Sequence, residues 1–320
     1  MAFPNVSDIV ATTIESRTKE IADNVTKNNA LLARLKEKGN IKTFSGGSVI
    51  FQELSFAQNG NTGYYSGYDL LPVAAQDVLS AAQYSIKQAA APIIISGLEM
   101  IQNSGKEQMI DLMDGRLAVG EASMYNLLAG GVYADGTGSG GKEITGLNAA
   151  VPISFGSGVY GGIDPSVWTF WQNQYTSAPN TNAATIQQSW NLQWAKQVRG
   201  RNRPDLIVVD TATWAIYLQS LQAIQRFSGT MVGNLGFPTI KFMDADVVLD
   251  GGIGGFCPAG TAFFLNTEYI FWRPHAERNM VPLAPNKRYA INQDAEVQIL
   301  AWAGNMTTSG RQFQGRWTNF

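Results

Sequence analysis

The stretch YADGTGSGGKEITGLNAAV (133–151) separates two parts of this 320-residue chain that differ in sequence pattern. Five glycines lie between residues 136 and 146, interspersed with polar side chains. Glycine-rich polar segments favour turns and loops over regular elements. We therefore interpret residues 134–146 as a glycine-rich loop and as the best candidate boundary between two domains.

A long helix is predicted immediately before this loop, over residues 106–130. Its interior glycines, Gly115 and Gly120, lower the intrinsic helix propensity, so tertiary packing has to support it. Gly130 and Gly131 are predicted to end it, because glycine favours the position just after a helix. The apolar face that we expect to pack is formed by Ile110, Met113, Leu117, Met124 and Leu128.

A second long helix is predicted near the N-terminus, over residues 7–38. Ser7 or Asn5 can serve as the N-cap, and Gly39 stands where a helix-ending glycine belongs. The narrow apolar stripe of this helix suits an arm lying along a neighbouring chain; a coiled coil or packing on its own domain are the alternatives. The stripe, which we take as a candidate subunit interface, consists of Ile14, Ile21, Val25, Leu32 and Leu35.

An extended hairpin is predicted between these helices. Residues 47–56 have strand character, and 78–90 show partial apolar alternation, although a helix over 74–91 is an alternative because alanine and glutamine favour helices. Such a hairpin is marginal alone in water and needs packing partners. The segment between the strands contains the residues that we predict to contact a neighbouring subunit: Tyr64, Tyr65, Tyr68 and Leu70. Local packing and base stacking are the alternatives, but no basic residue lies between positions 43 and 86 to favour nucleic acid.

The remaining chain mixes helices and strands. Ile93, Ile94 and Ile95 are expected to be buried, followed by a short helix near 97–103. The alternation after the glycine-rich loop is too irregular for a doubly wound sheet, so the predicted class is α+β. Helices are predicted at 184–199 and 211–225, and strands at 206–210, 240–250, 262–272, 296–304 and 311–317.

Composition limits the possible functions. Charged residues make up 15% of the chain, below the usual share of about 25%. This shortage fits a surface covered by partners, and equally a surface rich in uncharged polar residues. The net charge is −2, without a block of Lys or Arg, so a protein dedicated to gripping DNA is excluded and any DNA contact should be weak and non-specific.

No catalytic, cofactor-binding or metal-binding residue is predicted. His275 is the only histidine, which excludes a histidine metal cluster, and no GxSxG or GxxxxGK[ST] motif is present. Asp244, Asp246 and Asp250 are closely spaced but lie in strand-like sequence without the other EF-hand residues. Cys257 is the only cysteine, so no intrachain disulfide can form.

Targeting and membrane signals are not found either. The start MAFPNVSDIV lacks a basic region followed by an apolar core, so no signal peptide is expected. No apolar run approaches about 18 residues, so no membrane partner is expected.

The order of these elements resembles the major capsid proteins of tailed bacteriophages, whose fold is shared with herpesvirus shells. An arm, an extended hairpin, a long helix, a glycine-rich junction and an α/β domain follow one another in that family too. The resemblance covers essentially the whole chain and rests on element order and spacing rather than on one diagnostic motif. The segments that carry it are YADGTGSGGKEITGLNAAV (133–151), RNRPDLIVVDTATWAIY (201–217), PTIKFMDADVVLDGGI (238–253) and GTAFFLNTEYIFW (260–272).

This resemblance implies a tailed-phage capsid fold in four parts. The helix at 106–130 would be the spine helix of the peripheral domain. The parts would be an N-terminal arm (1–40), an extended loop (41–92), a discontinuous peripheral domain (93–150 and 269–299) and an axial domain (151–268 and 300–320).

The resemblance also implies a non-catalytic structural role. Pentamers and hexamers of this chain would form the icosahedral head around double-stranded DNA, after assembly in the host bacterial cytoplasm. A separate scaffolding protein is an implied partner, because the chain begins almost directly at the arm. A portal is a further implied partner, and the need for a decoration protein is left open. An encapsulin-like shell subunit around a protein cargo is the alternative, and an enzyme with an unfamiliar site is the third.

Overall fold

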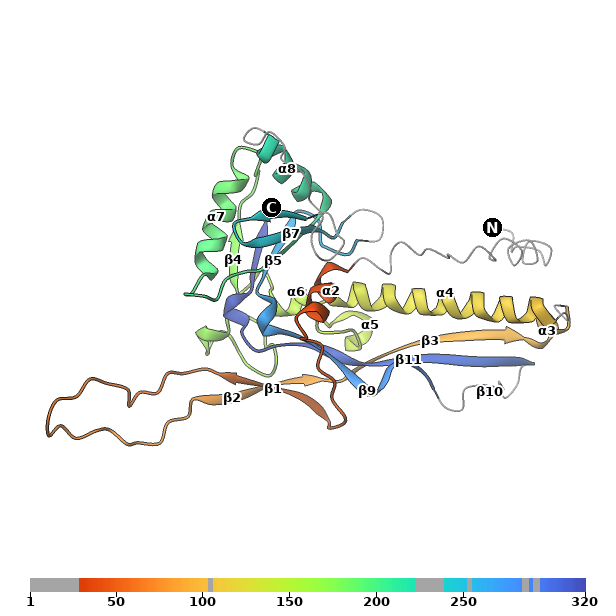
Figure 1. The fold of residues 1–320 in the computed structure, drawn as a ribbon, viewed down its shortest axis with the longest axis horizontal. Coiled ribbons are helices and arrows are strands. Elements are labelled where there is room, and N and C mark those ends of the chain that lie inside the picture. The colour runs from red at the N-terminus through yellow and green to blue at the C-terminus, as the bar shows by residue number, and fades with distance from the viewer. Residues whose placement is uncertain (1–28, 103–105, 223–238, 252–254, 284–287, 290–293) are drawn as a thin grey trace.

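The computed structural model describes residues 29–102, 106–222, 239–251, 255–283, 288–289 and 294–320. Three parts are visible in Figure 1: a sheet flanked by helices, a long helix lying on a second sheet, and a hairpin that projects away from both. Helices and strands thus occupy different layers, which confirms the predicted α+β class. No described helix is long and apolar enough to cross a membrane.

The first part is a mixed six-stranded sheet. Its central strands β5 and β8 are buried at every position, so the sheet is covered on both faces. One face packs on helices α7 and α8, and the other packs toward α2 and the end of α4. The sheet order is β4 (Gln174–Ser177), β12 (Gly315–Thr318), β8 (Thr261–Leu265), β5 (Leu206–Val209), β7 (Ala245–Leu249) and β6 (Thr239–Phe242), and the two helices are α7 (Ile186–Gln197) and α8 (Thr211–Gln222).

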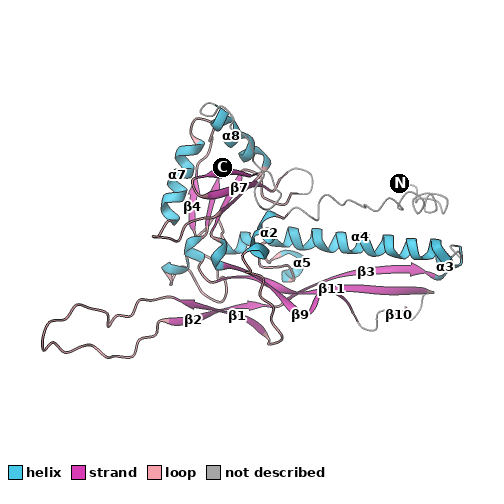
Figure 2. Ribbon diagram, viewed as in Figure 1, coloured by secondary structure: helices cyan, strands magenta, loops and turns pink. Residues whose placement is uncertain are grey.

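The second part is helix α4 (Lys106–Tyr133) on an antiparallel sheet (Figure 2). A Cβ at Gly120 would lie 2.9 Å from the Ile93 side chain, so the glycine allows the helix to approach strand β3 closely. Of the predicted apolar face, Met124 and Leu128 are buried; the side chains of Ile110, Met113 and Leu117 lie outside the described part. The other elements here are β3 (Lys87–Ser96), α3 (Gly97–Gln102), β9 (Ile270–Pro282), β10 (Arg288–Tyr289) and β11 (Ala295–Thr308).

Helix α4 does not end at Gly130 and Gly131, as the sequence predicted, but continues to Tyr133. A Cβ at Gly131 would lie 2.8 Å from Ile144 Cδ1, and one at Gly130 would lie 3.2 Å from the Phe256 ring. These glycines therefore serve close packing inside the helix rather than its termination. The glycine-rich loop follows, with two single-turn helices, α5 (Gly138–Gly141) and α6 (Leu147–Ala150).

The projecting hairpin consists of β1 (Val49–Ser55) and β2 (Leu79–Ser85), paired antiparallel from Val49↔Ser85 to Ser55↔Leu79. This confirms the predicted hairpin and excludes the helix considered for 74–91, but the predicted second strand at 78–90 divides at Ile86, beyond which β3 pairs with β11. Side chains alternate along β1, with Ile50, Gln52 and Leu54 buried, so one face of the hairpin root packs on the body.

Helix α2 (Ala30–Glu37) corrects the predicted 7–38 helix. Asn29 is in an extended conformation and its side chain accepts a hydrogen bond from Leu32 N, so the helix begins at Ala30. Residues 7–28 lie outside the described part. Gly39 ends the helix as predicted: it has φ +70°, its N–H donates to Lys36 O, and Asn40 N–H donates to Leu35 O.

Smaller corrections concern the strands. Ile93 and Ile95 are buried, but Ile94 is exposed, because successive side chains of β3 point to opposite faces. The 240–250 segment splits into β6 and β7 at Met243, which has φ +51°. The 262–272 segment is interrupted by η2 (Thr267–Tyr269), and the other short 3-10 turns are η1 (Thr169–Trp171) and η3 (Arg311–Phe313).

Candidate assembly surfaces

The tip segment, defined here as residues 57–77 between β1 and β2, carries the hairpin residues that the sequence singled out. Tyr64 and Tyr68 are fully exposed, Leu70 is 97% exposed and Tyr65 is 67% exposed. Short internal hydrogen bonds shape the segment, such as Ser66 N–H to Asp69 Oδ2 at 2.9 Å. All four residues lie on this tip segment, which projects away from the body of the chain (Figure 1). Their contact with a neighbouring subunit stays a prediction.

The root of the hairpin, in contrast, is fastened to the body. Gln83 N–H donates to Gly161 O at 2.9 Å, and the Tyr84 hydroxyl donates to Thr308 O at 3.0 Å. The Phe56 ring lies 5.7 Å from Trp168 and 5.9 Å from Phe170. Burial raises the pKa of Tyr84 well above its ordinary value, so this hydroxyl stays neutral and structural.

A small pocket of roughly 120 Å³ lies at this root. Its lining is apolar apart from one serine and contains no titratable group, so it offers no acid, base or nucleophile for catalysis. The lining residues are Phe56, Ser80, Ile163, Trp168 and Phe170.

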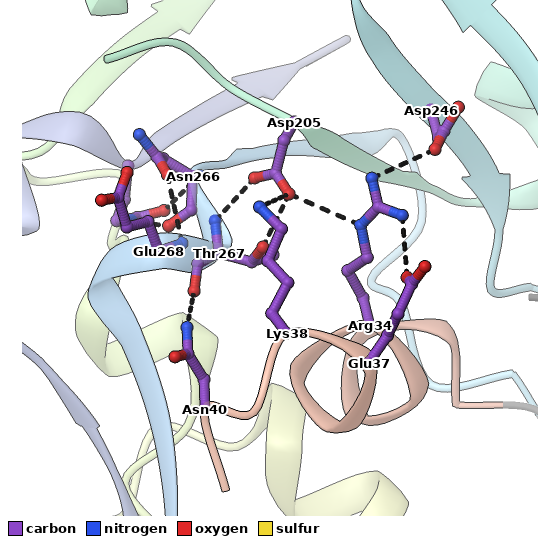
Figure 3. Close-up of polar contacts among 10 residues, drawn as sticks. Arg34, Glu37, Lys38, Asn40, Asp205, Asp246, Asn266, Thr267 and Glu268 are labelled. Atoms are coloured by element: carbon purple, nitrogen blue, oxygen red, sulfur yellow. Dashed lines mark hydrogen bonds and ion pairs between the residues drawn. The ribbon is translucent and has the colours of Figure 1, made fainter. Parts of the chain in front are cut away.

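Helix α2 is joined to the six-stranded sheet by an ion-pair network centred on Asp205 (Figure 3). Asp205 Oδ2 lies 2.7 Å from Lys38 Nζ and 3.5 Å from Arg34 Nε, and Arg34 also reaches Asp246 at 3.3 Å. The same carboxylate accepts hydrogen bonds from Thr267 N–H at 2.7 Å and Thr267 Oγ1 at 2.6 Å. One carboxylate therefore ties three segments together: α2, the start of β5 and the turn after β8.

The charge of Arg34 is stabilised by this network. Burial by itself lowers the pKa of the guanidinium, but the hydrogen bond to Glu37 and the charges of Asp205 and Asp246 outweigh burial, and the pKa is raised. The cation is thus held by three carboxylates in a partly buried site, where ion pairs are stronger than on an open surface.

The predicted arm stripe is only partly within the described residues. Leu35 is fully buried in the core of its own chain, which corrects its assignment to a subunit interface. Leu32 is half-buried against the same core. Ile14, Ile21 and Val25 lie outside the described part, and their interface role stays a prediction.

The three clustered aspartates have three different partners, so they do not form a shared site. Asp244 pairs with Arg203 at 2.7 Å, Asp246 pairs with Arg34, and Asp250 accepts a hydrogen bond from the Tyr133 hydroxyl. Burial raises the pKa of Asp250. Within the described ranges, no group of three His, Cys, Asp or Glu residues could hold a metal ion.

The two remaining reactive side chains are also in structural settings. Burial raises the pKa of the Cys257 thiol well above its ordinary value, which disfavours the nucleophilic thiolate. His275 is half-buried, packs edge-on against Phe44 at 5.1 Å between ring centroids, and accepts a hydrogen bond from Glu277 N–H at Nδ1. The described residues thus give no arrangement of nucleophile, base and orienting group.

This chain resembles known proteins in structure, but no match to a known family or curated protein was found by sequence. No protein-family model and no curated protein matches the chain. Among solved structures, the capsid asymmetric unit of cyanophage A-1(L) is similar with a TM-score of 0.68 and 14% identity, covering 95% of this chain and 96% of that one. A chain of the empty GTA particle capsid has a TM-score of 0.59 at 11% identity, with 99% of each chain covered. The chain has the tailed-phage capsid fold.

A third structure extends the comparison to another phage. A chain of Mycobacterium phage Bobi has a TM-score of 0.58 at 11% identity and covers 99% of each chain. Full coverage in both directions means that the hairpin, α4 and the six-stranded sheet all belong to the capsid fold, and that none of them is an added domain.

Within this capsid fold, sequence reasoning missed the Asp205 network. Arg34 and Lys38 are four residues apart and therefore share one face of α2, which was a detectable signal. Asp205 stands directly before the buried strand 206–209, but nothing in the sequence indicated that α2 would reach it across the chain.

Proposed function

We propose that this chain is a major capsid protein, a structural and non-catalytic subunit that self-assembles into the icosahedral head enclosing a phage double-stranded DNA genome. The observation that supports this most strongly is the combination of a capsid fold over the whole chain with a projecting tip segment whose apolar side chains are exposed.

The physical argument concerns the tip segment. Fixing the backbone of one residue costs about 1–2 kcal/mol of conformational entropy, and burial of apolar side chains normally offsets this cost. Tyr64, Tyr68 and Leu70 bury almost nothing within their own chain. A neighbouring subunit supplies the missing burial in a shell, where each copy meets several others.

The proposed division into parts follows the sequence prediction: arm (1–40), extended loop (41–92), peripheral domain (93–150 and 269–299) and axial domain (151–268 and 300–320). Strand β3 begins before residue 93, and β11 runs through residue 300. One continuous sheet therefore links the extended loop, the peripheral part and the axial part, and would transmit strain between them.

The proposed partners are other copies of this chain in pentamers and hexamers, a separate scaffolding protein, a portal, and weak non-specific contacts with DNA. The location is the virion, after assembly in the host cytoplasm. A cofactor has no role in this proposal. The similar structures include phage and GTA capsids, which supports a genome container over the encapsulin-like alternative.

Electron microscopy of the purified, expressed chain tests the proposal. We expect shells or capsomers, formed with or without a scaffolding protein. Particles that contain DNA or scaffold support the capsid proposal, whereas particles that co-purify with one enzyme support a cargo compartment. A chain that forms no particles or rings under any of these conditions would contradict both.

A further inference from the structure

An exposed basic turn lies between α7 and β5, in the sequence RGRNR (199–203). Arg199 N–H donates to Asn202 O at 2.8 Å and Asn202 N–H donates back to Arg199 O at 3.0 Å, so Gly200 and Arg201 form a two-residue loop. Gly200 has φ +62°, a conformation that favours glycine. The turn is therefore a defined structure with arginines at its tip.

Two cations of this turn have no counter-ion among the described residues. Arg203 is paired with Asp244, and Lys196 donates to Tyr175 O and Thr176 Oγ1. Arg199 and Arg201 are exposed, and neither forms an ion pair with any other residue in the described ranges. A second basic group, Arg34 and Lys38 on α2, is already matched by Asp205 and Asp246.

The projecting hairpin has the opposite charge. Residues 43–86 contain Glu53, Asp69 and Asp77 and no basic residue. All three carboxylates are exposed, and none forms an ion pair within the described part of the chain. Asp69 is next to Tyr68, so a guanidinium bound there would meet both a carboxylate and an exposed aromatic ring, the two groups with which arginine interacts best.

We propose that the basic turn at 199–203 of one copy binds the acidic tip segment of a neighbouring copy. This inference rests on the proposed shell function and names the surface that receives the hairpin. Both surfaces belong to the same chain: the turn presents exposed arginines, and the tip segment presents exposed carboxylates. A contact between two different patches of identical subunits is heterologous, and it generates rings such as pentamers and hexamers where the rotation between subunits closes. Complementary charge fixes the register and accelerates the encounter.

Packaged DNA is the rival ligand for the turn. A phosphate backbone would engage Arg199 and Arg201 by charge alone, without the aromatic component. The chain as a whole carries a net charge of −2, and the carboxylates of its hairpin form no ion pair among the described residues. A second copy would bind both the turn and the hairpin, whereas DNA would bind only the turn.

A charge-swap mixing experiment on the full chain tests the inference. One variant reverses the turn (Arg199→Glu and Arg201→Glu) and the other reverses the hairpin (Asp69→Lys and Asp77→Lys). Each variant alone places like charges opposite one another, so we expect the protein concentration needed for assembly to rise roughly tenfold or more. In a 1:1 mixture the two variants can alternate around a hexamer with every contact restored, whereas a pentamer keeps at least one mismatched contact, so assembly should return toward the wild-type concentration without fully reaching it.

The control for the turn variant is the double variant Lys142→Glu and Lys241→Glu, which makes the same change in net charge as the turn variant at two exposed lysines elsewhere. We expect it to assemble like wild type, and all variants should keep the wild-type melting temperature before assembly. Normal assembly of the turn variant alone, or no gain on mixing, would overturn the inference. If the turn variant assembles normally but loses binding to a short DNA duplex, the turn is a DNA contact instead. Failure of the wild-type chain to assemble would count against the proposed function itself, which separates the two claims.

Discussion

Strands β5 and β8 bury every residue that they contain, whereas the tip segment at 57–77 exposes nearly all of its side chains. One region of the chain therefore buries its side chains within its own subunit, and the other region does not. The sheet offsets the entropy of its own ordering by burial on both faces. The tip segment has no such compensation within its own chain, although it contains side chains of the same apolar and aromatic types.

The contrast explains how one subunit can be stable and still be built for assembly. Around Trp190, four aromatic rings lie within 6.2 Å between centroids: Tyr217, Phe242, Phe264 and Trp317. Around Tyr64 and Tyr68 there is solvent. Substitutions in the first region should therefore change the free energy of unfolding, and substitutions in the second should change only assembly.

The largest effect on stability is expected from Trp190→Ala. Trp190 is fully buried and stacks on Tyr217 at 4.6 Å, so truncation should lower the free energy of unfolding by about 3–5 kcal/mol. Urea denaturation of the unassembled subunit measures this. Leu70→Ala in the tip segment is the control and should change stability by less than about 0.5 kcal/mol. Similar losses in the two variants would remove the contrast between the regions.

The next largest effect is expected from Asp205→Ala, at the junction between α2 and the sheet. Removal of this carboxylate leaves Lys38 and the Thr267 N–H and hydroxyl without their acceptor, and takes away one of the three carboxylates around Arg34, so it should cost about 2–3 kcal/mol. Asp244→Ala is the matched control, because its single ion pair with Arg203 is exposed and should contribute less than about 1 kcal/mol. Equal losses for the two aspartates would show that the network does not anchor α2.

A smaller, pH-dependent effect is expected from Glu99→Gln. The hydrogen bond from Arg116 lowers the pKa of Glu99 below its ordinary value of 4.5. The resulting stabilisation is present above that value and is lost as the pH falls through the folded-state pKa. The variant should lose less than about 1 kcal/mol at neutral pH and less still in acid. Melting temperatures measured from pH 7 to pH 3 check this; a constant difference across that range would argue against the ion pair as the cause.

The smallest effect on the subunit is expected from the triple variant Tyr64→Ser, Tyr65→Ser and Tyr68→Ser. Because these rings are exposed, the free energy of unfolding should change by less than about 0.5 kcal/mol. Assembly into shells should nevertheless be lost or strongly weakened, since exposed tyrosines are frequent anchors of protein interfaces. Denaturation and electron microscopy of the same preparation give both readings. Normal shells from this variant would show that the tyrosines are not interface anchors.

The hairpin and the helix ends show what the sequence could predict. Alternating side chains on either side of a glycine-rich segment predicted β1 and β2, and Gly39 predicted the end of α2, because both signals are local. Gly130 and Gly131 carried the same local signal as Gly39 but lie inside α4. What distinguishes them is contact with Ile144, beyond the glycine-rich loop, and with Phe256, which is far along the chain.

The candidate surfaces likewise include features that the sequence predicted and features that it did not. The exposure of Tyr64, Tyr65, Tyr68 and Leu70 followed from their polar, glycine-rich context. The burial of Leu35 did not, because a helical stripe shows that a face is covered and not which chain covers it. The Asp205 network also escaped prediction, since its members are brought together only by the fold.

Sedimentation velocity of the full, wild-type chain over a wide range of concentrations tests most directly whether the tip segment needs a neighbouring subunit to bury its exposed side chains. We expect rings or shells far larger than the 34.7 kDa subunit, in a proportion that grows with concentration. A single sharp monomer of 34.7 kDa that persists at the highest concentration, with and without a scaffolding protein, would contradict the account.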